Sequence, residues 1–523
     1  MSRFADPLSP DLDQLSLRWL WVLFLAALFT GFFYNLDGFA LFDLDEGAFS
    51  EATRNMLERG DFLATYLFGE PRYDKPILIY WLQALSVSAL GLNEFALRLP
   101  SALASAGWML LIWAFTRRVL DHHTALAAGI IGATTIGIII VGRGAIADAA
   151  LNLFIAGAMF AIFLHFREGG HRWVYLAFAC MGLGFLTKGP VAVVIPLAVS
   201  LIFYALKGRW RDWLKAAFNP LGILLFLLLV LPWYLAITWR EGPGFLLGFF
   251  LEHNLQRFLE PMESHSGPIF YYLPVLLVVM LPYTTVMLRS FVELKERFRD
   301  DLQGYLLLWF LFVLALFSLA STKLPHYIFY GVTPLFILMA MHLDAVRSRF
   351  LLFLPPALLF GALLALPELV GLIKPHVDDD FILALLSDYP QHFGPLWHAF
   401  FAIATVAAVF FMFDRRMARA WRIFLLGLVM NVGVAGLLLP AAAGLQQAPI
   451  KAAGLAARDL PDTVVMWRLH NPSFNIYAER SVERREPEVG EVAVTKQDSL
   501  ERLEDYEILF SQRGVVLVRV LAR

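Results

Sequence analysis

Long runs of apolar residues, almost free of charge, recur along the whole chain. The first run, residues 19–36, is too long for the core of a signal peptide and has no small-residue cleavage pattern after it, so we predict a retained membrane helix. Twelve further runs follow, near 98–116, 124–142, 149–166, 172–187, 189–206, 217–239, 269–288, 303–320, 327–345, 350–372, 395–413 and 421–442. This pattern predicts an α-helical polytopic membrane protein with about 13 transmembrane helices.

One further apolar segment, residues 77–92, is short for a hydrocarbon core of roughly 30 Å, and we expect it to be interfacial or re-entrant. The distribution of Lys and Arg supports this interpretation. With the N-terminus inside, basic clusters such as those at 117–118, 207–215 and 415–422 all fall on cytoplasmic connections. Counting 77–92 as a full span would move these clusters to the outside. An odd number of spans then places the C-terminal tail outside.

The tail changes character at about residue 446, where it becomes charged and carries short strand-like segments near 463–467, 475–477, 492–494, 506–510 and 515–521, some of which also fit helix fragments. We therefore expect two domains: a transmembrane domain, 1–445, and a small α/β domain, 446–523, on the outer face.

Composition agrees with a membrane protein and narrows the function. The chain of 523 residues is 59% hydrophobic and 16% charged, with a mean hydropathy of +0.65, whereas soluble proteins carry roughly 25% charged residues. A net charge of −2 gives no footprint for nucleic acid. The single cysteine, Cys180, can form no internal disulfide.

The predicted first outer loop, 37–97, carries the densest set of ionisable residues. Asp45 and Glu46 begin a segment whose spacing predicts an amphipathic helix on the membrane surface, ending at Gly60. The acidic pair fits a catalytic centre, and it fits equally a helix start favoured by the dipole. Lys75, which follows Asp74, can bind a phosphate or simply snorkel to the interface.

Other predicted outer connections add further charged and aromatic groups, namely Asp148, Lys188, Arg257, His265, Lys323 and Tyr327. A phosphate needs cationic partners, and a hydroxyl nucleophile needs a carboxylate base. Acids and cations gathered on one side of a membrane therefore indicate transfer of a group from an anionic, lipid-linked substrate.

The order of these motifs resembles a known class of enzyme. Asp45-Glu46, Tyr73-Asp-Lys75-Pro76, Glu94-Phe-Ala-Leu-Arg98-Leu-Pro100 and Ser321-Thr-Lys323-Leu-Pro-His-Tyr327 are similar to motifs of the polyprenyl-phosphate-sugar-dependent glycosyltransferases with the GT-C fold. The resemblance is nearest to the bacterial branch that contains protein O-mannosyltransferases and the lipid A aminoarabinose transferase.

This resemblance implies an inverting glycosyltransferase of the bacterial inner membrane, acting at its periplasmic face. The donor would be a sugar on undecaprenyl phosphate, and the acceptor lipid A, another envelope glycolipid or a protein. Asp45 and Asp148 would be catalytic, with Glu46 beside them, and Lys75 and Tyr327 would bind the donor phosphate. Arg257, Lys323 and Lys188 are further candidates for that phosphate. The resemblance also implies a zinc ion held by Asp74 and His265, although two ligands make an incomplete site.

The chain departs from the aminoarabinose branch at Ala48 and Phe49, where that branch has Arg and Tyr, and at Ile77, where Pro is common. Losing a cation beside Asp45 favours a different donor head group or acceptor. Two other functions fit parts of the pattern. A lipid-linked-sugar flippase would place charges at mid-membrane, and an O-antigen-ligase-type transferase would concentrate its key residues in a late outer loop. This chain instead gathers its charges at one surface and in the first loop.

Overall fold

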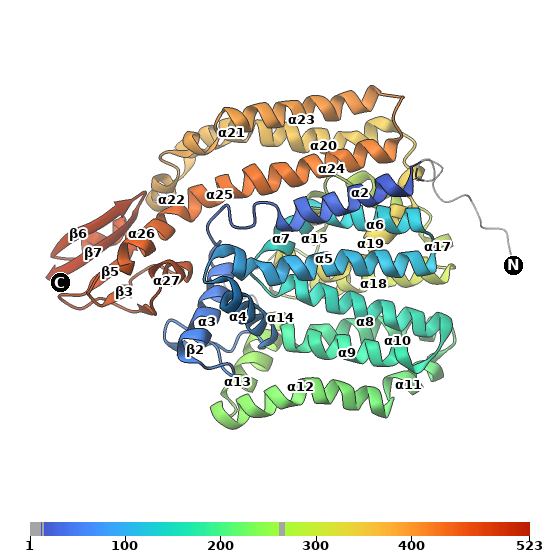
Figure 1. Ribbon diagram of the computed structural model, residues 1–523, viewed down its shortest axis with the longest axis horizontal. Helices are drawn as coiled ribbons and strands as arrows, with labels where there is room; N and C mark the ends of the chain where they lie inside the picture. Colours follow the sequence, from blue (N-terminus) through green and yellow to red (C-terminus); the bar gives the residue numbers. More distant parts are fainter. Residues whose placement is uncertain (1–11, 13–14, 261–266, 523) are drawn as a thin grey trace.

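The computed structural model describes residues 12, 15–260 and 267–522. Most of the chain forms a bundle of roughly parallel and antiparallel helices (Figure 1). The helices of the bundle are α2 (Leu17–Leu28) with its continuation η1 (Phe29–Phe33), α5 (Glu94–Val119), α6 (His122–Ala133), α7 (Ile136–Arg143), α8 (Asp148–Glu168), α9 (His171–Lys188), α10 (Val191–Leu206), α12 (Pro220–Glu241), α15 (Tyr272–Val279), α16 (Thr284–Ser290), α18 (Asp301–Leu319), α19 (Thr333–Met341), α20 (Arg349–Leu364), α21 (Leu366–Ile373), α23 (Pro395–Phe413), α24 (Arg419–Gly433), η7 (Val434–Leu438) and α25 (Leu439–Gln446).

Shorter helices connect these elements. They are α11 (Trp210–Ala217), α13 (Gly244–Leu246), η2 (Leu247–Gln256), α14 (Arg257–Leu259), α17 (Leu294–Arg297), η3 (Pro325–Gly331), η4 (Leu343–Ala345), η5 (Lys374–His376), α22 (Asp380–Leu385) and η6 (Tyr389–His392).

The bundle is that of a multi-pass membrane protein. By length and hydropathy, six helices in the described residues can cross a membrane, or up to eight if the bent pairs α6–α7 and α20–α21 each form one span. The two pairs bend by 67° and 54°. Each of the thirteen predicted apolar runs coincides with one helix or with two or three consecutive helices. The helical class is therefore confirmed, whereas the number of thirteen spans stays a prediction.

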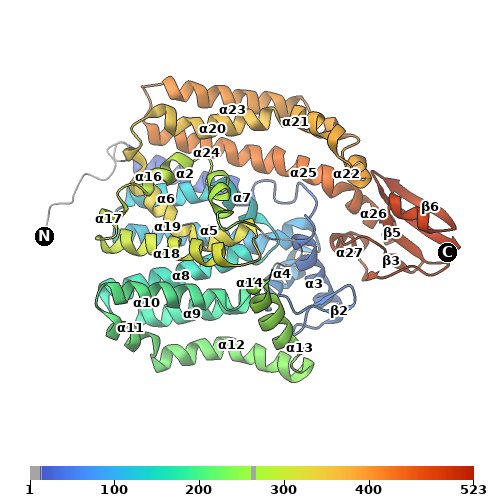
Figure 2. The same ribbon diagram turned by 180° about the vertical axis from the view of Figure 1, so that it is seen from behind.

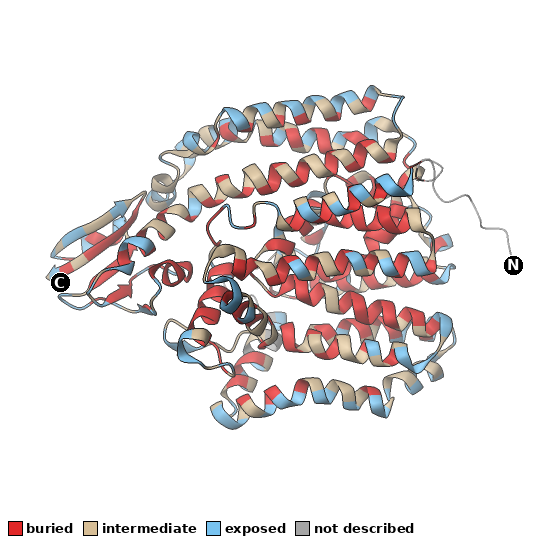
Figure 3. Ribbon diagram, in the orientation of Figure 1, coloured by how far each residue is buried: buried red, intermediate tan, exposed pale blue. Residues whose placement is uncertain are grey.

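Burial separates the helices at the centre of the bundle from those at its edges (Figure 3). In α8, 78% of the most apolar stretch is buried, but in α12 and α23 the share is 28%. An apolar helix that leaves most of its surface uncovered needs an apolar solvent around it. The outer helices α12 and α23 are therefore expected to face lipid, and the core of the bundle lies around α5 and α8.

Several short elements gather at one end of the bundle, next to the C-terminal sheet (Figures 1 and 2). They are α3 (Asp45–Arg59), the hairpin β1 (Tyr66–Leu67) and β2 (Glu70–Pro71), α4 (Leu78–Leu90) and α14. A helix of 13 residues such as α4 is about 20 Å long, which is too short for a hydrocarbon core of roughly 30 Å. This length agrees with the interfacial position expected for residues 77–92.

The helix α3 corrects one prediction, because it does not lie on a surface. Every residue from Glu46 to Met56 is buried, so the helix has no solvent-facing stripe over most of its length. The reason is that α27 (Ser473–Ala478) of the C-terminal domain packs against α3 from one side, and α4 packs against it as well. A covering element more than 400 residues away is invisible to a local hydropathy pattern.

The C-terminal domain begins with α26 (Ala448–Arg458) and contains a five-stranded sheet of order β4-β3-β5-β7-β6. Its elements are β3 (Val464–Met466), α27, β4 (Glu483–Arg484), β5 (Val492–Lys496), η8 (Gln497–Arg502), β6 (Asp505–Gln512) and β7 (Val515–Ala522). The strand β3 pairs parallel with β4 and β5, and the remaining pairs are antiparallel. Successive residues of β7 alternate between two cores, since Leu517 packs with Ile450 of α26 and Val516 with Leu500. The segment 475–477 lies within a helix.

Candidate active site

Asp45 is the first residue of α3, and its side chain is exposed. An acid in the first turn is favoured by the helix dipole, and the helix ends at Gly60, whose φ of 63° suits a left-handed C-cap. Within the part of the chain that the structure describes, the Asp45 carboxylate makes no hydrogen bond or ion pair. It is therefore available to a substrate.

Glu46, the neighbouring acid, is fully engaged by protein groups. Its Oε1 accepts hydrogen bonds from Arg98 Nε at 2.8 Å and Ala145 N at 2.7 Å, and its Oε2 accepts from Arg98 Nη2 at 2.8 Å and Phe42 N at 2.9 Å. Burial alone would raise the pKa of Glu46, but the charge and hydrogen bonds of Arg98 outweigh it and lower that pKa. With these four acceptor positions filled, Glu46 ties the loop to α5, and its predicted catalytic role stays a prediction.

Asp148 begins α8 and is buried against Lys188, the last residue of α9. Both carboxylate oxygens lie 2.8 Å from Lys188 Nζ, and the Tyr330 hydroxyl donates to Oδ1 at 2.9 Å. Two of the three protons of the ammonium are therefore used by Asp148, which leaves one for a ligand oxygen. Asp148 and Lys188 consequently act as a neutral pair, and neither is an isolated acid or cation.

His326 marks the place where the predicted residues come together. Four charged groups from separate segments act electrostatically on its imidazole, namely Asp148, Lys188, Asp45 and Lys75. Burial lowers the pKa of His326 to about 4, so the ring is neutral at neutral pH. A neutral imidazole offers one donor and one acceptor nitrogen. His326 therefore lies within electrostatic reach of two acids and two lysines, and it can bind a polar ligand atom without adding charge.

Asp74 precedes Lys75 in the loop between β2 and α4. Its Oδ1 is 2.7 Å from His253 Nε2, and its Oδ2 accepts from Arg72 Nε at 3.1 Å. Burial would raise the pKa of Asp74, but the hydrogen bond with His253 and the charges of Arg72 and Lys75 hold that pKa well below its usual range.

These contacts do not fit a zinc site. A guanidinium occupies one oxygen of Asp74 and repels a cation, and the 2.7 Å contact with His253 leaves no room for a metal between the two atoms. The described residues contain no cluster of three or more His, Cys, Asp or Glu able to hold a metal ion. His265, the other predicted ligand, lies outside the described residues. Zinc binding stays a prediction.

Lys323 differs from its predicted role. Its Nζ donates to the carbonyl oxygens of Ser318 at 2.9 Å and Ala320 at 2.7 Å, at the C-terminal end of α18, and it is 5% exposed. A cation at this position satisfies carbonyls that have no partner in the helix. The structure thus gives Lys323 a capping role. Tyr327, on η3, stacks near Phe317 and His326 and borders the cluster.

Arg257 lies on α14 at the same end of the bundle, and its side chain lies outside the described residues. Sequence reasoning missed several partners that hold the site together: Arg98, Tyr330, Arg72, His253 and His326. Of these, Arg98 and His326 stood inside motifs that were recognised, but no local signal indicated which acid each would contact.

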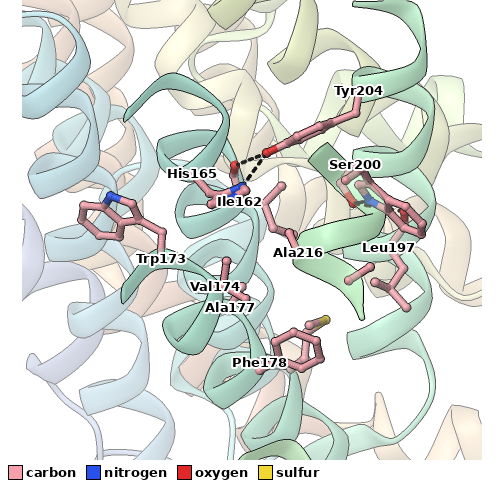
Figure 4. Close-up of a pocket in the computed structure, with 13 residues that line it drawn as sticks. Ile162, His165, Trp173, Val174, Ala177, Phe178, Leu197, Ser200, Tyr204 and Ala216 are labelled. Atoms are coloured by element: carbon pink, nitrogen blue, oxygen red, sulfur yellow. Dashed lines mark hydrogen bonds between the residues drawn. The ribbon is translucent and has the colours of Figure 1, made fainter. Parts of the chain in front are cut away.

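A separate cavity opens far from this cluster (Figure 4). It is lined by α8, α9, α10 and α11, and its polar groups are His165, whose Nδ1 lies 2.9 Å from Tyr204 Oη, and Ser200, which accepts from Trp213 Nε1 at 2.8 Å. His165 lies seventeen residues beyond Asp148 on α8, which corresponds to about 25 Å. This cavity is therefore not part of the charged cluster.

Comparisons with known proteins agree in sequence and in fold. The profile of the dolichyl-phosphate-mannose-protein mannosyltransferase family matches residues 74–235. An undecaprenyl phosphate-alpha-4-amino-4-deoxy-L-arabinose arabinosyl transferase of Serratia proteamaculans is 32% identical over 348 residues, 64% of this chain and 62% of that protein. A protein of the same description from Yersinia pestis is 31% identical over 397 residues, 73% of this chain and 69% of the relative. The match to the Serratia protein thus spans less than two thirds of its length.

Two solved structures share the fold. ArnT from Cupriavidus metallidurans, bound to undecaprenyl phosphate, superposes with a TM-score of 0.82 at 18% identity, over 96% of this chain and 98% of that one. The oligosaccharyltransferase of Archaeoglobus fulgidus gives a TM-score of 0.54 at 13% identity, over 89% of this chain and 64% of that one. The GT-C architecture expected from the sequence is therefore confirmed.

Proposed function

The chain belongs to the family of undecaprenyl phosphate-aminoarabinose arabinosyl transferases, and from this premise we propose that it moves a sugar from undecaprenyl phosphate to an acceptor glycolipid. The proposed donor sugar is 4-amino-4-deoxy-L-arabinose, the sugar that the relatives are named for, and the proposed acceptor is a phosphate of lipid A. The enzyme is thus a membrane glycosyltransferase.

One observation carries this proposal: the exposed carboxylate of Asp45, which has no hydrogen-bond or ion-pair partner among the described residues, acts together with the charge of Lys75 on the neutral His326. A transfer from a lipid phosphate needs a cation where the leaving phosphate develops charge and an acid near the sugar carbon. Both requirements are met within one cluster at one end of the bundle.

Lys75 is the proposed ligand of the donor phosphate, because the family that the chain resembles binds this phosphate with the lysine of the Lys-Pro motif and because the charge of Lys75 acts on His326. Its Nζ donates to the backbone oxygen of Asp74 at 3.0 Å, Lys323 donates to two carbonyls of α18, and Lys188 places two of its protons on Asp148. The Tyr327 hydroxyl is a second candidate, because its ring lies next to His326 in the cluster. Lys75 would stabilise the negative charge that develops on undecaprenyl phosphate as it leaves.

The reaction needs no covalent intermediate. An acceptor oxygen forms a bond to the anomeric carbon from one face while the bond to the donor phosphate oxygen breaks on the other, and its electron pair leaves with undecaprenyl phosphate. The configuration is thereby inverted. A phosphate acceptor carries no proton that must be removed, so Asp45 stabilises positive charge on the sugar or orients the acceptor. For a hydroxyl acceptor, Asp45 takes the proton.

The surroundings of Phe49 include a cation. Its ring stacks on Tyr80 with centroids 5.4 Å apart, and the Arg72 guanidinium lies 5.0 Å from its centroid. The charge of Asp45 in turn acts on Arg72. The charge of a cation therefore acts on Asp45 although position 48 is an alanine, and this cation, Arg72, is itself paired with Asp74.

We propose the orientation in which the site and the C-terminal domain face the periplasm. The N-terminal residue of α5, Glu94, bonds to Tyr477 and Lys451 of the C-terminal domain, whereas Arg117 and Arg118 lie near the other end of this 26-residue helix, about 35 Å away. Basic residues at the end remote from the site support a cytoplasmic position for that end.

The test is transfer by the purified protein in detergent with lipid A and the synthetic undecaprenyl-phosphate-linked aminopentose, read by mass spectrometry. The wild type is expected to give modified lipid A. Asn in place of Asp45 is expected to lower kcat by at least 100-fold with normal accumulation in the membrane. Transfer by Asp45→Asn at the wild-type rate would contradict the assigned role, and normal rates of lipid translocation without transfer would favour a flippase.

A further inference from the structure

The carboxylate of Asp43, two residues before Asp45, is held by the C-terminal domain. Its Oδ1 accepts a hydrogen bond from the backbone N–H of Ser473 at 3.0 Å. Its Oδ2 accepts from the Ser473 hydroxyl at 2.5 Å and from Asn471 Nδ2 at 3.1 Å. Ser473 is fully buried and begins α27. Three donors from one domain thus converge on one acid of another.

Gly47 provides the space for this contact. A Cβ atom at position 47 would lie 2.0 Å from Asp43 Oδ1 and 2.7 Å from the backbone nitrogen of Ser473. The carboxylate therefore rests directly on the first turn of α3, and any side chain at this position would push it away. We call Asp43, Gly47, Asn471 and Ser473 the latch.

The latch belongs to a wider contact between the C-terminal domain and the first loop. The Tyr477 hydroxyl accepts from Leu41 N at 2.8 Å, just before Asp43. At the far end of the contact, Arg54 Nη2 donates to the Ser481 hydroxyl at 2.9 Å. The loop is thus fixed by this domain before Asp43, at Asp43 and again along α3.

Asp45 lies between two fixed points. Asp43 is bound to the C-terminal domain, and Glu46 is bound to Arg98 of α5. Only Leu44 and Asp45 lie between these two fixed residues, so fixing residues 43 and 46 restricts the positions that residue 45 can take. Asp45 itself is exposed and makes no bond to the described residues that would hold it. Its location therefore depends on its neighbours.

We infer that the latch positions Asp45 for sugar transfer, so that the C-terminal domain is a working part of the active site. This inference rests on the proposed function. Asp43 and Ser473 act through Asp45 as positioning residues and do not touch the substrate. Because a misplacement of about 1 Å can cost 100-fold in rate, loosening the latch should lower kcat and leave donor binding at Lys75 intact.

The test compares Asp43→Ala, Ser473→Ala and Gly47→Ala with Ser481→Ala, which removes a hydroxyl from the same interface at a distance from Asp45. Each full-length variant is assayed in detergent for kcat and donor KM, and hydrogen exchange is measured on peptides that cover residues 41–47. The latch variants are expected to lose at least about tenfold in kcat with donor KM within about twofold, and to exchange faster at 41–47. Ser481→Ala should match the wild type in kcat and in exchange at 41–47.

Asp43→Asn provides the conservative comparison, because its amide oxygen can still accept from Ser473. It should recover part of the rate that Asp43→Ala loses, which a general loss of stability would not produce. Faster exchange at 41–47 with a wild-type kcat would overturn the inference, as would unchanged exchange in every latch variant. If Asp43→Ala fails to accumulate, Ser473→Ala decides, since it deletes one hydroxyl. If the wild type shows no transfer, the proposed function is refuted but the contact between the latch residues is not, because hydrogen exchange at residues 41–47 measures that contact without any enzyme activity.

Discussion

The pair formed by Glu46 and Arg98 allows the sharpest test of the structure. Replacing Arg98 with Met leaves the Glu46 carboxylate buried, 6% exposed, with only the backbone donors of Phe42 and Ala145. Removing one partner of a buried ion pair costs about 3–5 kcal/mol. Arg98 also donates to three carbonyl oxygens, those of Leu36, Phe39 and Ala40, and each lost bond adds about 1 kcal/mol.

The double variant Glu46→Gln/Arg98→Met separates these contributions. Replacing Glu46 with Gln removes the buried, unpaired charge and so recovers its cost of about 3–5 kcal/mol. About 1 kcal/mol of this gain is lost, because the NH2 group of Gln points at a backbone N–H and two donors cannot bond to each other. The double variant should therefore be about 2–4 kcal/mol more stable than Arg98→Met, although the carbonyl bonds remain lost. We expect the order of stability wild type, Glu46→Gln, double variant, Arg98→Met.

The assay is thermal inactivation in detergent at a fixed heating rate, together with transfer activity below the transition. Glu46→Gln should keep most of its transfer activity, since Glu46 holds the loop and the proposed mechanism places only Asp45 at the substrate. Two results would refute this reasoning: a double variant no more stable than Arg98→Met, or a well-folded Glu46→Gln without transfer. The second would return Glu46 to the catalytic role that the sequence favoured.

Three further predictions concern the other charged groups. Lys75→Ala should raise donor KM at least about tenfold in the transfer assay because it removes a charged phosphate ligand, whereas Lys323→Ala should leave KM unchanged and lower thermal stability by about 1 kcal/mol through the lost cap of α18. Lys188→Met leaves Asp148 buried and unpaired, so it should destabilise by about 3–5 kcal/mol; adding Asp148→Asn should restore much of the thermal midpoint, and a double variant as unstable as the single would argue against the pair. Burial raises the pKa of Asp43 to about 6, above the unfolded value of 3.8, so the folded state binds this proton more tightly than the unfolded state does. The stability that protonated Asp43 contributes should therefore be present below about pH 4 and be lost as the pH rises through 6. In thermal scans from pH 4 to 7, the wild type should lose this contribution relative to Asp43→Asn, and parallel curves of the two proteins would contradict the prediction.

The sequence determined the class of the protein and the neighbourhood of its site. The length and the ends of an apolar run can be seen in the local sequence alone. For this reason helices appear at each predicted run, and residues 77–92 form a short helix. The start of a helix at Asp45 and its end at Gly60 follow from equally local preferences.

Only the tertiary structure decided which of the charged residues are available. Asp45 and Glu46 are adjacent in sequence, yet one is exposed and the other is paired with a residue 52 positions away. Asp148 meets a tyrosine 182 positions away, and Asp43 meets a serine 430 positions away. Whether an ionisable group can bind a ligand or instead holds the protein together depends on the residues that bury it and pair with it. In this chain those residues come from distant segments. The small charged fraction of the chain therefore marks the region of the candidate site, while the packing of the C-terminal domain and of α5 engages Asp43 and Glu46 and leaves Asp45 exposed between them.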